Sequence, residues 1–145
     1  MIIGKLNQYL NKGGGMKIQF LPVILVGDFN SAATGEPTYK LITLTNRYKD
    51  TWLINTLNDN PEGLTFGHDF NLQNPTQNFW KRIDYIFVRN GREWGKGINL
   101  ISVTAEVLGD DPGDKTPSGL WPSDHGGVAA ELTFSLWNNI YSWKK

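Results

Sequence analysis

The chain has 145 residues and no cysteine, and its 14 lysines and arginines balance 14 aspartates and glutamates. The lack of cysteine excludes a disulfide framework, a zinc–thiolate site and a cysteine nucleophile. The balanced charge restricts any contact with nucleic acid to a local basic patch. Hydrophobic residues make up 39% of the chain, which is enough apolar surface for one core. We therefore expect residues 1–145 to form a single soluble domain, and the sequence leaves its compartment open.

The N-terminal residues predict a short helix rather than a membrane segment. Apolar residues recur there at helical spacing, which predicts an amphipathic helix over Ile2–Leu10 that ends at the glycines 13–15. The sequence has no apolar run of the ~20 residues that a membrane span needs. Its first residues also lack the charged and apolar regions of a signal peptide.

Three further segments are expected before residue 80. Leu21–Gly27 is a continuous apolar run rich in β-branched residues, which predicts a buried central strand. Pro37 opens a helix that runs through Ile42, since proline suits the first helical turn. Asn58–Asn78 is rich in Asn, Pro, Gly and Asp, and it predicts a long surface loop.

The second half of the chain predicts strands joined by turns. The alternation after residue 82 places Ile83, Tyr85 and Phe87 on one face of a strand. Residues 109–114 are turn formers, and the aromatic tail from 136 to 145 fits neither a strand nor a helix clearly. The expected strands are Arg82–Val88, Ile98–Leu108 and Gly127–Phe134.

Polar residues stand within or at the ends of three of these apolar segments. Asp28 and Asn30 follow the first strand, where a carboxylate beside a carboxamide can orient a water molecule or a magnesium ion. Asp84 lies in an otherwise apolar strand, where an unpaired carboxylate is costly. His125, which follows Asp124 just before the last strand, is the expected partner, because an aspartate–imidazolium pair recovers part of that cost.

Each of these clusters also has a purely structural interpretation. Asp28 can cap the segment that follows it. A single aspartate in a strand is more often structural than catalytic, and a single histidine often only satisfies a turn. Three such clusters in one short chain are harder to explain in this way, so we favour a common site.

The segments that carry these residues resemble the last three sequence motifs of the endonuclease/exonuclease/phosphatase superfamily, in the order found there. The resemblance covers essentially residues 1–135. It implies an α/β (α+β) fold that is half of a four-layer sandwich of the deoxyribonuclease-I-like type, with a mixed sheet flanked by helices. The motif segments are Val23–Asn30, Lys81–Phe87 and Trp121–Val128.

The resemblance also implies magnesium-dependent hydrolysis of a phosphoester, as in a phosphodiesterase, nuclease or phosphatase. By analogy, Asp28 positions or deprotonates the attacking water, and Asn30 helps to orient the water and the phosphate. His125 contacts the scissile phosphate and is kept protonated by Asp84, which agrees with the pairing expected from burial. Asp28 and Asp124 lie on the metal side, where Mg²⁺ or Mn²⁺ is expected to bind weakly.

The first part of the family pattern is missing from this sequence. Members of the superfamily carry an asparagine, a metal-binding glutamate and a histidine or tyrosine ahead of the first of these motifs, whereas residues 1–27 contain no Glu, Asp or His. The chain therefore looks like a C-terminal half without its main metal carboxylate, and we expect impaired activity. The alternative is a half-fold without turnover that acts as a binding or oligomerising module.

The remaining expectations concern the substrate and the assembly. The substrate is a phosphoester, with nucleic acid as one option, and four basic residues either bind its phosphates or lie on an ordinary sheet surface. His68 is expected to be solvated in its loop, and three tryptophans to pack in or near the core rather than to stack on a base. A sheet face without its partner layer predicts a homodimer or higher oligomer, or association with a missing N-terminal half. The residues meant are Lys81, Arg82, Arg89 and Arg92 for the basic patch and Trp80, Trp94 and Trp121 for the tryptophans.

Overall fold

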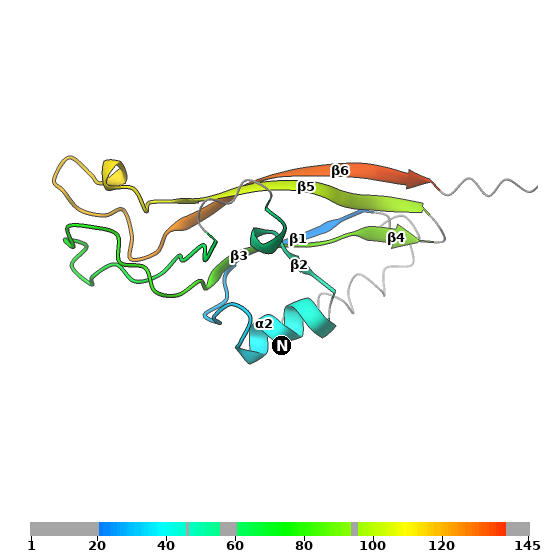
Figure 1. The fold of residues 1–145 in the computed structure, drawn as a ribbon, viewed down its shortest axis with the longest axis horizontal. Helices are drawn as coiled ribbons and strands as arrows, with labels where there is room; N and C mark the ends of the chain where they lie inside the picture. The colour runs from blue at the N-terminus through cyan, green and yellow to red at the C-terminus, as the bar shows by residue number, and fades with distance from the viewer. Residues whose placement is uncertain (1–20, 46, 56–60, 94–95, 139–145) are drawn as a thin grey trace, which may run out of the picture.

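The computed structural model describes residues 21–45, 47–55, 61–93 and 96–138. In chain order, its elements are β1 (Val23–Asp28), α2 (Pro37–Lys40), a π-helical turn (Leu41–Thr45), β2 (Lys49–Asp50), a 3₁₀ turn (Trp52–Ile54), β3 (Asp84–Arg89), β4 (Gly91–Glu93), β5 (Lys96–Leu108), a second 3₁₀ turn (Pro112–Asp114) and β6 (Gly127–Asn138). Figure 1 shows three layers: the long β5–β6 hairpin lies above the β1–β3–β2 sheet, and α2 lies below that sheet.

The described strands form two antiparallel sheets, with the orders β1–β3–β2 and β4–β5–β6. β1 and β3 pair along their whole length, so that Val23 lies opposite Arg89 and Asp28 lies opposite Asp84. β4 follows β3 after one residue and pairs with β5. The chain therefore passes from one sheet to the other at Asn90.

The two faces of β3 are buried against different layers. Phe87 points towards α2, and Val88 points towards the β5–β6 hairpin; both are fully buried. This alternation is what a period of two residues demands of a strand that lies between two layers. The buried residues packed with Phe87 are Tyr39, Ile42, Tyr48 and Tyr85, and those packed with Val88 are Leu100 and Val103.

Most of the strand and helix predictions are confirmed within a few residues. The helix expected after Pro37 is α2 with its π-helical continuation, and Ile83, Tyr85 and Phe87 are all buried as expected. β3 starts at Asp84, so this aspartate is the first residue of the strand rather than a central one. The last strand extends to residue 138, into the tail that the sequence left open. The expected helix over residues 2–10 and the end of the tail lie outside the described residues.

The prediction that the first strand is central and buried is wrong for the part of the chain described. β1 is an edge strand whose one neighbour in the sheet is β3, and Ile24 and Val26 are 50% and 62% exposed. An apolar run indicates that both faces of a strand can be buried, but it cannot supply the layer that buries them.

The expectation of a sheet face without any partner layer also needs correction. Val88 of β3 is buried by β5 and β6, so the hairpin already supplies part of the second sheet of a sandwich. Ile24 lies opposite Val88 in the register and therefore on the same face. The hairpin thus covers β3, but Ile24 and Val26 of β1 remain exposed on that face.

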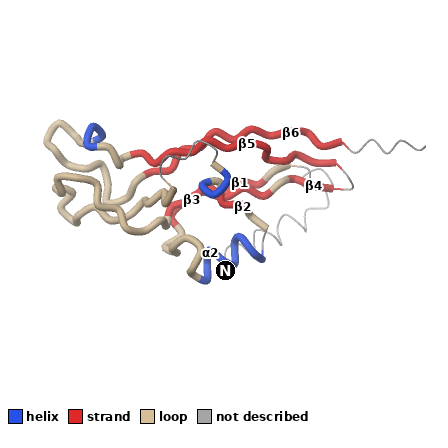
Figure 2. Tube along the Cα trace, viewed as in Figure 1, coloured by secondary structure: helices blue, strands red, loops and turns tan. Residues whose placement is uncertain are grey.

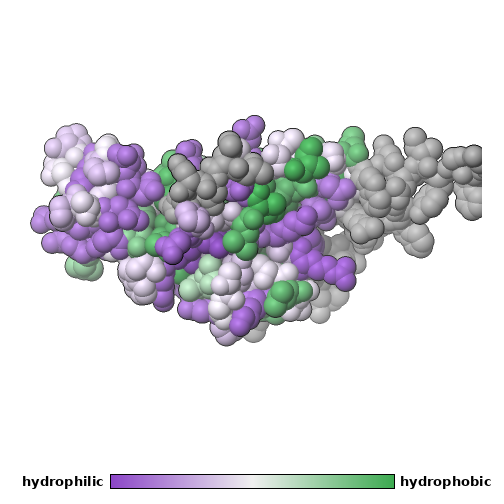
Figure 3. All heavy atoms as spheres, viewed as in Figure 1, coloured by the Kyte–Doolittle hydropathy of each residue, from purple (hydrophilic) through white to green (hydrophobic). Residues whose placement is uncertain are grey.

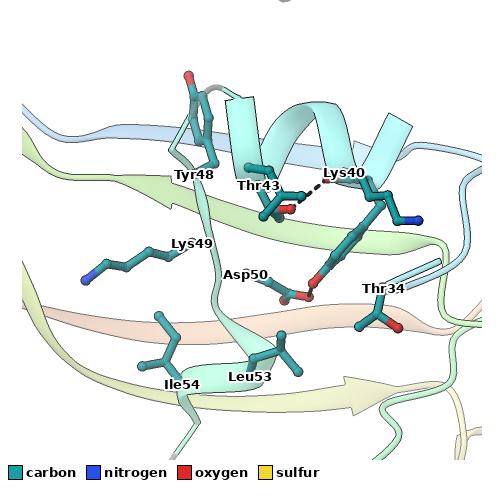
Figure 4. Close-up of a pocket in the computed structure, with 10 residues that line it drawn as sticks. Thr34, Lys40, Thr43, Tyr48, Lys49, Asp50, Leu53 and Ile54 are labelled. Atoms are coloured by element: carbon teal, nitrogen blue, oxygen red, sulfur yellow. Dashed lines mark hydrogen bonds between the residues drawn. The ribbon is translucent and has the colours of Figure 1, made fainter. Parts of the chain in front are cut away.

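A cavity of about 550 Å³ lies between α2, β2 and the turn that follows β2 (Figure 4). Leu53 and Ile54 line one side of it, and Lys40 and Thr43 line the other. At its wall, Tyr39 donates a hydrogen bond of 2.8 Å to Asp50, and burial beside this carboxylate raises the pKa of Tyr39 to about 12. The cavity contains no residue of the three motif clusters.

The surface seen in Figure 3 divides into two regions. Hydrophobic side chains reach the surface across the middle of the molecule, whereas the end that carries the loops is mostly hydrophilic. Figure 2 shows that this loop end is also where β1 ends and where β3 and β6 begin. The polar residues of all three motifs are therefore brought to one end. None of the described helices is long and apolar enough to cross a membrane.

Candidate active site

The register of β1 and β3 sets two carboxylates opposite each other. Asp28 is the last residue of β1 and Asp84 is the first of β3, and they are direct cross-strand partners. Partners of this kind lie on the same face with their Cβ atoms about 5 Å apart, and like charges in such positions destabilise a sheet. The folded chain therefore needs a cation close to this pair.

His125 supplies a titratable partner at this position. Its Nδ1 lies 2.9 Å from Oδ2 of Asp84, which confirms the contact predicted from the cost of burying a carboxylate. One side-chain ligand atom from each of Asp28, Asp84 and His125 lies within 4.8 Å of the others. Three segments that are far apart in the sequence thus meet in one cluster, which we call the Asp–Asp–His cluster.

The electrostatic surroundings favour the imidazolium form of His125. Partial burial opposes the charged form and is the largest single contribution, but the remaining ones together outweigh it. They are the hydrogen bond to Asp84 and the negative charges of Asp84, Asp124 and Asp28, so the pKa of His125 is raised above its ordinary value of 6.5.

Asn30 holds the carboxylate of Asp28 in place. The backbone N–H of Asn30 donates to Oδ1 of Asp28 at 2.7 Å, and its side-chain amide donates to Oδ2 at 3.0 Å. Asn30 has a φ of 47°, a left-handed conformation that asparagine tolerates better than most residues. The structural interpretation of Asp28 is thus correct as far as it goes, because the carboxylate does order the turn after β1. Both residues are exposed, so the same carboxylate is open to solvent.

Asp124 lies beside the cluster without belonging to it. Its carboxylate is exposed and accepts a hydrogen bond of 3.3 Å from Ser123. Its backbone carbonyl accepts from the N–H groups of Gly67 and His68, at 3.2 and 3.3 Å. The loop before β3 therefore fixes the backbone of Asp124, and its carboxylate stays available.

The donor set fits a hard divalent cation in part. Asp28 and Asp124 present exposed carboxylates, and magnesium is usually held by one or two carboxylates together with water. Asp84 shares one oxygen with His125. The residues whose possible ligand atoms lie within 4.8 Å of one another are Asp28, Asp84 and His125, and Asp124 comes directly before His125 in the chain.

A buried threonine joins the segments that carry Asp84 and His125. Oγ1 of Thr65 accepts from the backbone N–H groups of Ile83 and Asp84, both at 3.2 Å. The Thr65 carbonyl accepts from the N–H of Gly126 at 2.7 Å, and Thr65 is fully buried. The neighbouring Phe66 forms bridges to residues on both sides, Lys81 and His125.

This connection was not predicted from the sequence. Thr65 falls in the segment expected to be a surface loop, and the available signal was the short alternation of Leu64, Thr65 and Phe66. That alternation covers too few residues to predict a strand. The segment acts as a bridge because it pairs with residues far along the chain.

The prediction that His68 is solvated is wrong. Its side chain is buried, and its ring stacks on Trp121 with the ring centroids 4.0 Å apart. Nε2 of His68 lies 3.2 Å from the carbonyl of Gly109, and Nδ1 lies 2.8 Å from the side-chain amide of Asn74. His68 therefore acts as a structural residue that anchors the polar loop to the segment before β6.

Both interpretations of the four basic residues, a phosphate-binding patch and an ordinary sheet surface, are wrong for Arg82. This side chain is buried and forms a salt bridge of 2.6 Å with Asp50, so it cannot reach a phosphate. The guanidinium of Arg89 lies over the ring of Tyr48 at 5.2 Å. The side chain of Arg92 is outside the described part of the structure, and the ammonium group of Lys81 lies over the ring of Trp80 at 4.9 Å.

The tryptophans divide between core and surface. Trp121 is 1% exposed, which confirms the expected core packing, but Trp80 is 60% exposed, so that expectation is wrong for Trp80. Trp94 lies outside the described residues. Trp80 contacts Phe66, which in turn contacts His125.

Comparisons with known proteins agree with this arrangement. Residues 13–125 match the model of the Endonuclease/Exonuclease/phosphatase family. A solved structure of an endonuclease/exonuclease/phosphatase family protein from Leptotrichia buccalis superposes with a TM-score of 0.54 at 23% identity, over 89% of this chain and 41% of that one. A comparison with curated protein sequences gives no match.

The match to the family model includes the complete Asp–Asp–His cluster and ends at His125. The similarity to the solved structure confirms the predicted fold class, and it shows that this chain spans well under half of that protein. The chain therefore belongs to the endonuclease/exonuclease/phosphatase family.

Proposed function

We propose that this chain carries catalytic groups of a metal-dependent hydrolase that cleaves a phosphoester. The observation that supports this most directly is the Asp–Asp–His cluster, in which His125 is hydrogen-bonded to Asp84 at 2.9 Å and lies beside the exposed Asp28. A carboxylate and an imidazolium on one small surface can act on opposite sides of a phosphate, one towards the nucleophile and the other towards the phosphoryl oxygens.

Asp28 acts on the attacking water. Its carboxylate accepts the proton of the water as the water oxygen bonds to phosphorus, while the bond from phosphorus to the ester oxygen breaks and this leaving oxygen takes a proton from solvent. Asn30 keeps the carboxylate in position through the bonds of 2.7 and 3.0 Å. A carboxylate that is already fixed does not have to be ordered in the transition state, so the barrier is lower.

His125 acts on the phosphate. The hydrogen bonds of the described residues engage its Nδ1 and leave Nε2 free to donate to a phosphoryl oxygen. Asp84 orients the ring and keeps it positively charged, and a preorganised cation stabilises the charge that builds up on the phosphoryl oxygens. Asp84 is thus a positioning residue, and His125 is the residue that touches the substrate.

A divalent metal ion would be held by Asp28 and Asp124. When bound, such an ion neutralises charge on the phosphate and helps to orient the water. Because Mg²⁺ held by one or two carboxylates is normally held by substrate phosphates as well, we propose that Mg²⁺ or Mn²⁺ binds weakly to this chain without substrate.

A second function is favoured by a different observation. Ile24 and Val26 leave an apolar strip of β1 exposed on the inner face of the sandwich, and sheet faces of this kind are normally covered. The alternative proposal is therefore a half-fold that binds or oligomerises without turnover. The two proposals differ in whether the chain by itself turns over a substrate.

The test is hydrolysis of bis(p-nitrophenyl) phosphate and of p-nitrophenyl phosphate, with Mg²⁺ or Mn²⁺ and with EDTA. We expect slow, metal-dependent release of nitrophenol that His125→Ala abolishes and Asp84→Asn reduces. Glu131→Gln, an exposed change on β6, serves as the control and is expected to keep the full rate. A rate that persists in His125→Ala would refute the catalytic role, and no rate in the unmodified chain would favour the binding module.

A further inference from the structure

Trp80 is a large exposed aromatic residue next to the candidate active site. It is 60% exposed, whereas Trp52 and Trp121 are 4% and 1% exposed. Leaving an indole in water forgoes a large hydrophobic stabilisation. Single exposed apolar residues are ordinary on protein surfaces, so the exposure of Trp80 is informative only together with its position and its neighbours.

A chain of ring contacts connects Trp80 to His125. The ring of Phe66 lies 4.8 Å from that of His125 and 5.8 Å from that of Trp80, measured between centroids. A group held on Trp80 would therefore lie two ring contacts away from the imidazole proposed to hold the scissile phosphate.

The indole of Trp80 is held in place before any ligand arrives. A Cβ atom added at Gly67 would lie 2.4 Å from Cδ1 of Trp80 and 2.8 Å from the carbonyl oxygen of Asn78, so the indole rests directly on the backbone of Gly67. Gly67 is itself fixed by its N–H, which donates to the carbonyl of Asp124 at 3.2 Å. A side chain that is already ordered loses little entropy when it binds a ligand.

The charge next to Trp80 indicates which kind of ligand could stack on its ring, an anionic one or a cationic one. Nζ of Lys81 lies 4.9 Å from the centre of the Trp80 ring. This ammonium group attracts a phosphate and repels a quaternary ammonium headgroup that would otherwise be a good partner for a tryptophan face. An anionic ligand with a flat ring can stack on Trp80 and pair its negative charge with Lys81.

We infer that Trp80 and Lys81 form a binding subsite for a single-stranded nucleic acid, in which Trp80 stacks on a base and Lys81 contacts a flanking phosphate. This inference rests on the proposed function, because it places that base next to the phosphate at His125. Stacking on a tryptophan requires an unstacked base, which single strands offer. Lys81 has a long, flexible side chain, so its ammonium group moves to the phosphate when a base occupies the ring.

The test is a binding measurement without turnover. Fluorescence anisotropy in EDTA compares a labelled single-stranded oligothymidylate with an abasic oligomer of the same length. We expect the unmodified chain to prefer the oligomer with bases, and Trp80→Ala to weaken its binding by about 5- to 150-fold, the range expected for one stacked base. Trp80→Phe should retain most of the preference, and Trp80→Leu, which is apolar but not aromatic, should lose it.

Two further variants test the specificity of the effect. Phe70 is fully exposed elsewhere on the same loop, so Phe70→Ala is the matched control and should bind like the unmodified chain. Lys81→Gln should reduce the slope of log affinity against log salt by about 0.7, the contribution of one phosphate contact on a single strand.

The outcomes separate this inference from the proposed function. If Trp80→Ala binds both oligomers like the unmodified chain, the subsite is refuted, whatever the rate of hydrolysis. Binding to phosphatidylcholine vesicles that depends on Trp80, without base preference, would replace the nucleic acid by a lipid surface and also refute it. His125→Ala should lose hydrolysis and keep the base preference. A base preference in a chain without any hydrolysis would support the subsite and refute the proposed enzyme.

Discussion

Asp28 and Asp84 face each other as direct partners in the antiparallel pairing of β1 and β3, and His125 bonds to the second of them. The strand pairing thus concentrates negative charge at the position where His125, two residues before β6, places its imidazole ring. Without His125, the end of this strand pair would hold two opposed carboxylates at a cost to stability. The same contact that stabilises the fold therefore also orients the imidazole ring of His125, as the proposed contact with a phosphate requires.

The first prediction concerns the protonation of His125. Its pKa is raised in the folded chain, so protonation favours folding. The resulting stabilisation is fully present below the unfolded pKa, near 6.5, and it is lost as the pH rises through the higher folded pKa. Urea unfolding in EDTA at a series of pH values should show this decline, and it should be absent in His125→Gln.

The pKa itself can be measured by NMR titration of the imidazole protons. The chain has two histidines, so the His125→Gln variant assigns the signals. Asp84→Asn should lower the pKa of His125, because it removes both the hydrogen bond and the nearest charge. A pKa of His125 below 6.5 in the unmodified chain would contradict the geometry described above.

The second prediction concerns Thr65 as a positioning residue. Thr65→Val removes the oxygen that accepts from the N–H groups of Ile83 and Asp84, and it leaves these donors unpaired in the interior. We expect a loss of about 1–3 kcal/mol in the free energy of unfolding, together with a shift of the His125 pKa towards its ordinary value. Thr65→Ser keeps the oxygen and should lose much less. Equal effects of the two variants in denaturant unfolding would argue against this role.

The third prediction concerns the buried pair of Arg82 and Asp50. Breaking a buried ion pair from one side leaves an uncompensated charge, which typically costs about 3–5 kcal/mol. Asp50→Asn should therefore lower the free energy of unfolding strongly, since Asp50 also accepts from Tyr39 and from the backbone of Trp52. The affinity of the folded protein for an oligonucleotide should not change with Asp50→Asn, because Arg82 is buried and contributes to folding only. A change in affinity at unchanged stability would contradict this assignment.

The sequence predicted the contacts of the Asp–Asp–His cluster better than the contacts of the residues around it. Asp28, Asp84 and His125 were expected together because each disturbs an apolar strand or its end, and such local conflicts are visible in sequence. Their contact then follows from a general rule, that a buried carboxylate needs a partner.

The surroundings escaped prediction because they depend on long-range contacts. β2 is two residues long, which is too short for any periodicity. Arg82 was expected at the surface because nothing near it in the sequence indicates its partner, Asp50, which lies far away in the chain. His68 and Thr65 lie in a polar segment, and they are buried by Trp121 and by the start of β3 rather than by their sequence neighbours.

The fourth prediction concerns metal binding. We expect isothermal calorimetry to give a magnesium affinity in the millimolar range or weaker, because Asp28 and Asp124 leave most of an octahedral shell to water. Asp28→Asn should weaken binding further. Asp111→Asn, in the turn before β6, is the control and should have no effect, since Asp111 is engaged in capping its own turn. Micromolar affinity would show that further groups of the chain complete the shell.

The fifth prediction concerns self-association through β1. Ile24 and Val26 are exposed on the face that the β5–β6 hairpin covers only over β3, and among the described strands β1 lies at the edge of its sheet, where a strand can pair with another chain. Two copies that meet at this face, related by a two-fold axis, would bury both the exposed apolar side chains and the edge of β1. A separate chain that supplies the missing layer would do the same. We therefore expect a homodimer or higher oligomer whenever no such chain is present.

Light scattering over a dilution series measures this association directly. Ile24→Lys places a charge in the exposed strip and should shift the protein to monomer. The variant should stay folded, because Ile24 is already half exposed. Leu44→Lys is the matched control, since Leu44 is 76% exposed on the π-helical turn and lies outside the strip. If the unmodified chain is a folded monomer at all concentrations, the strip does not drive association. If both lysine variants dissociate the oligomer equally, the interface is not the one formed by β1.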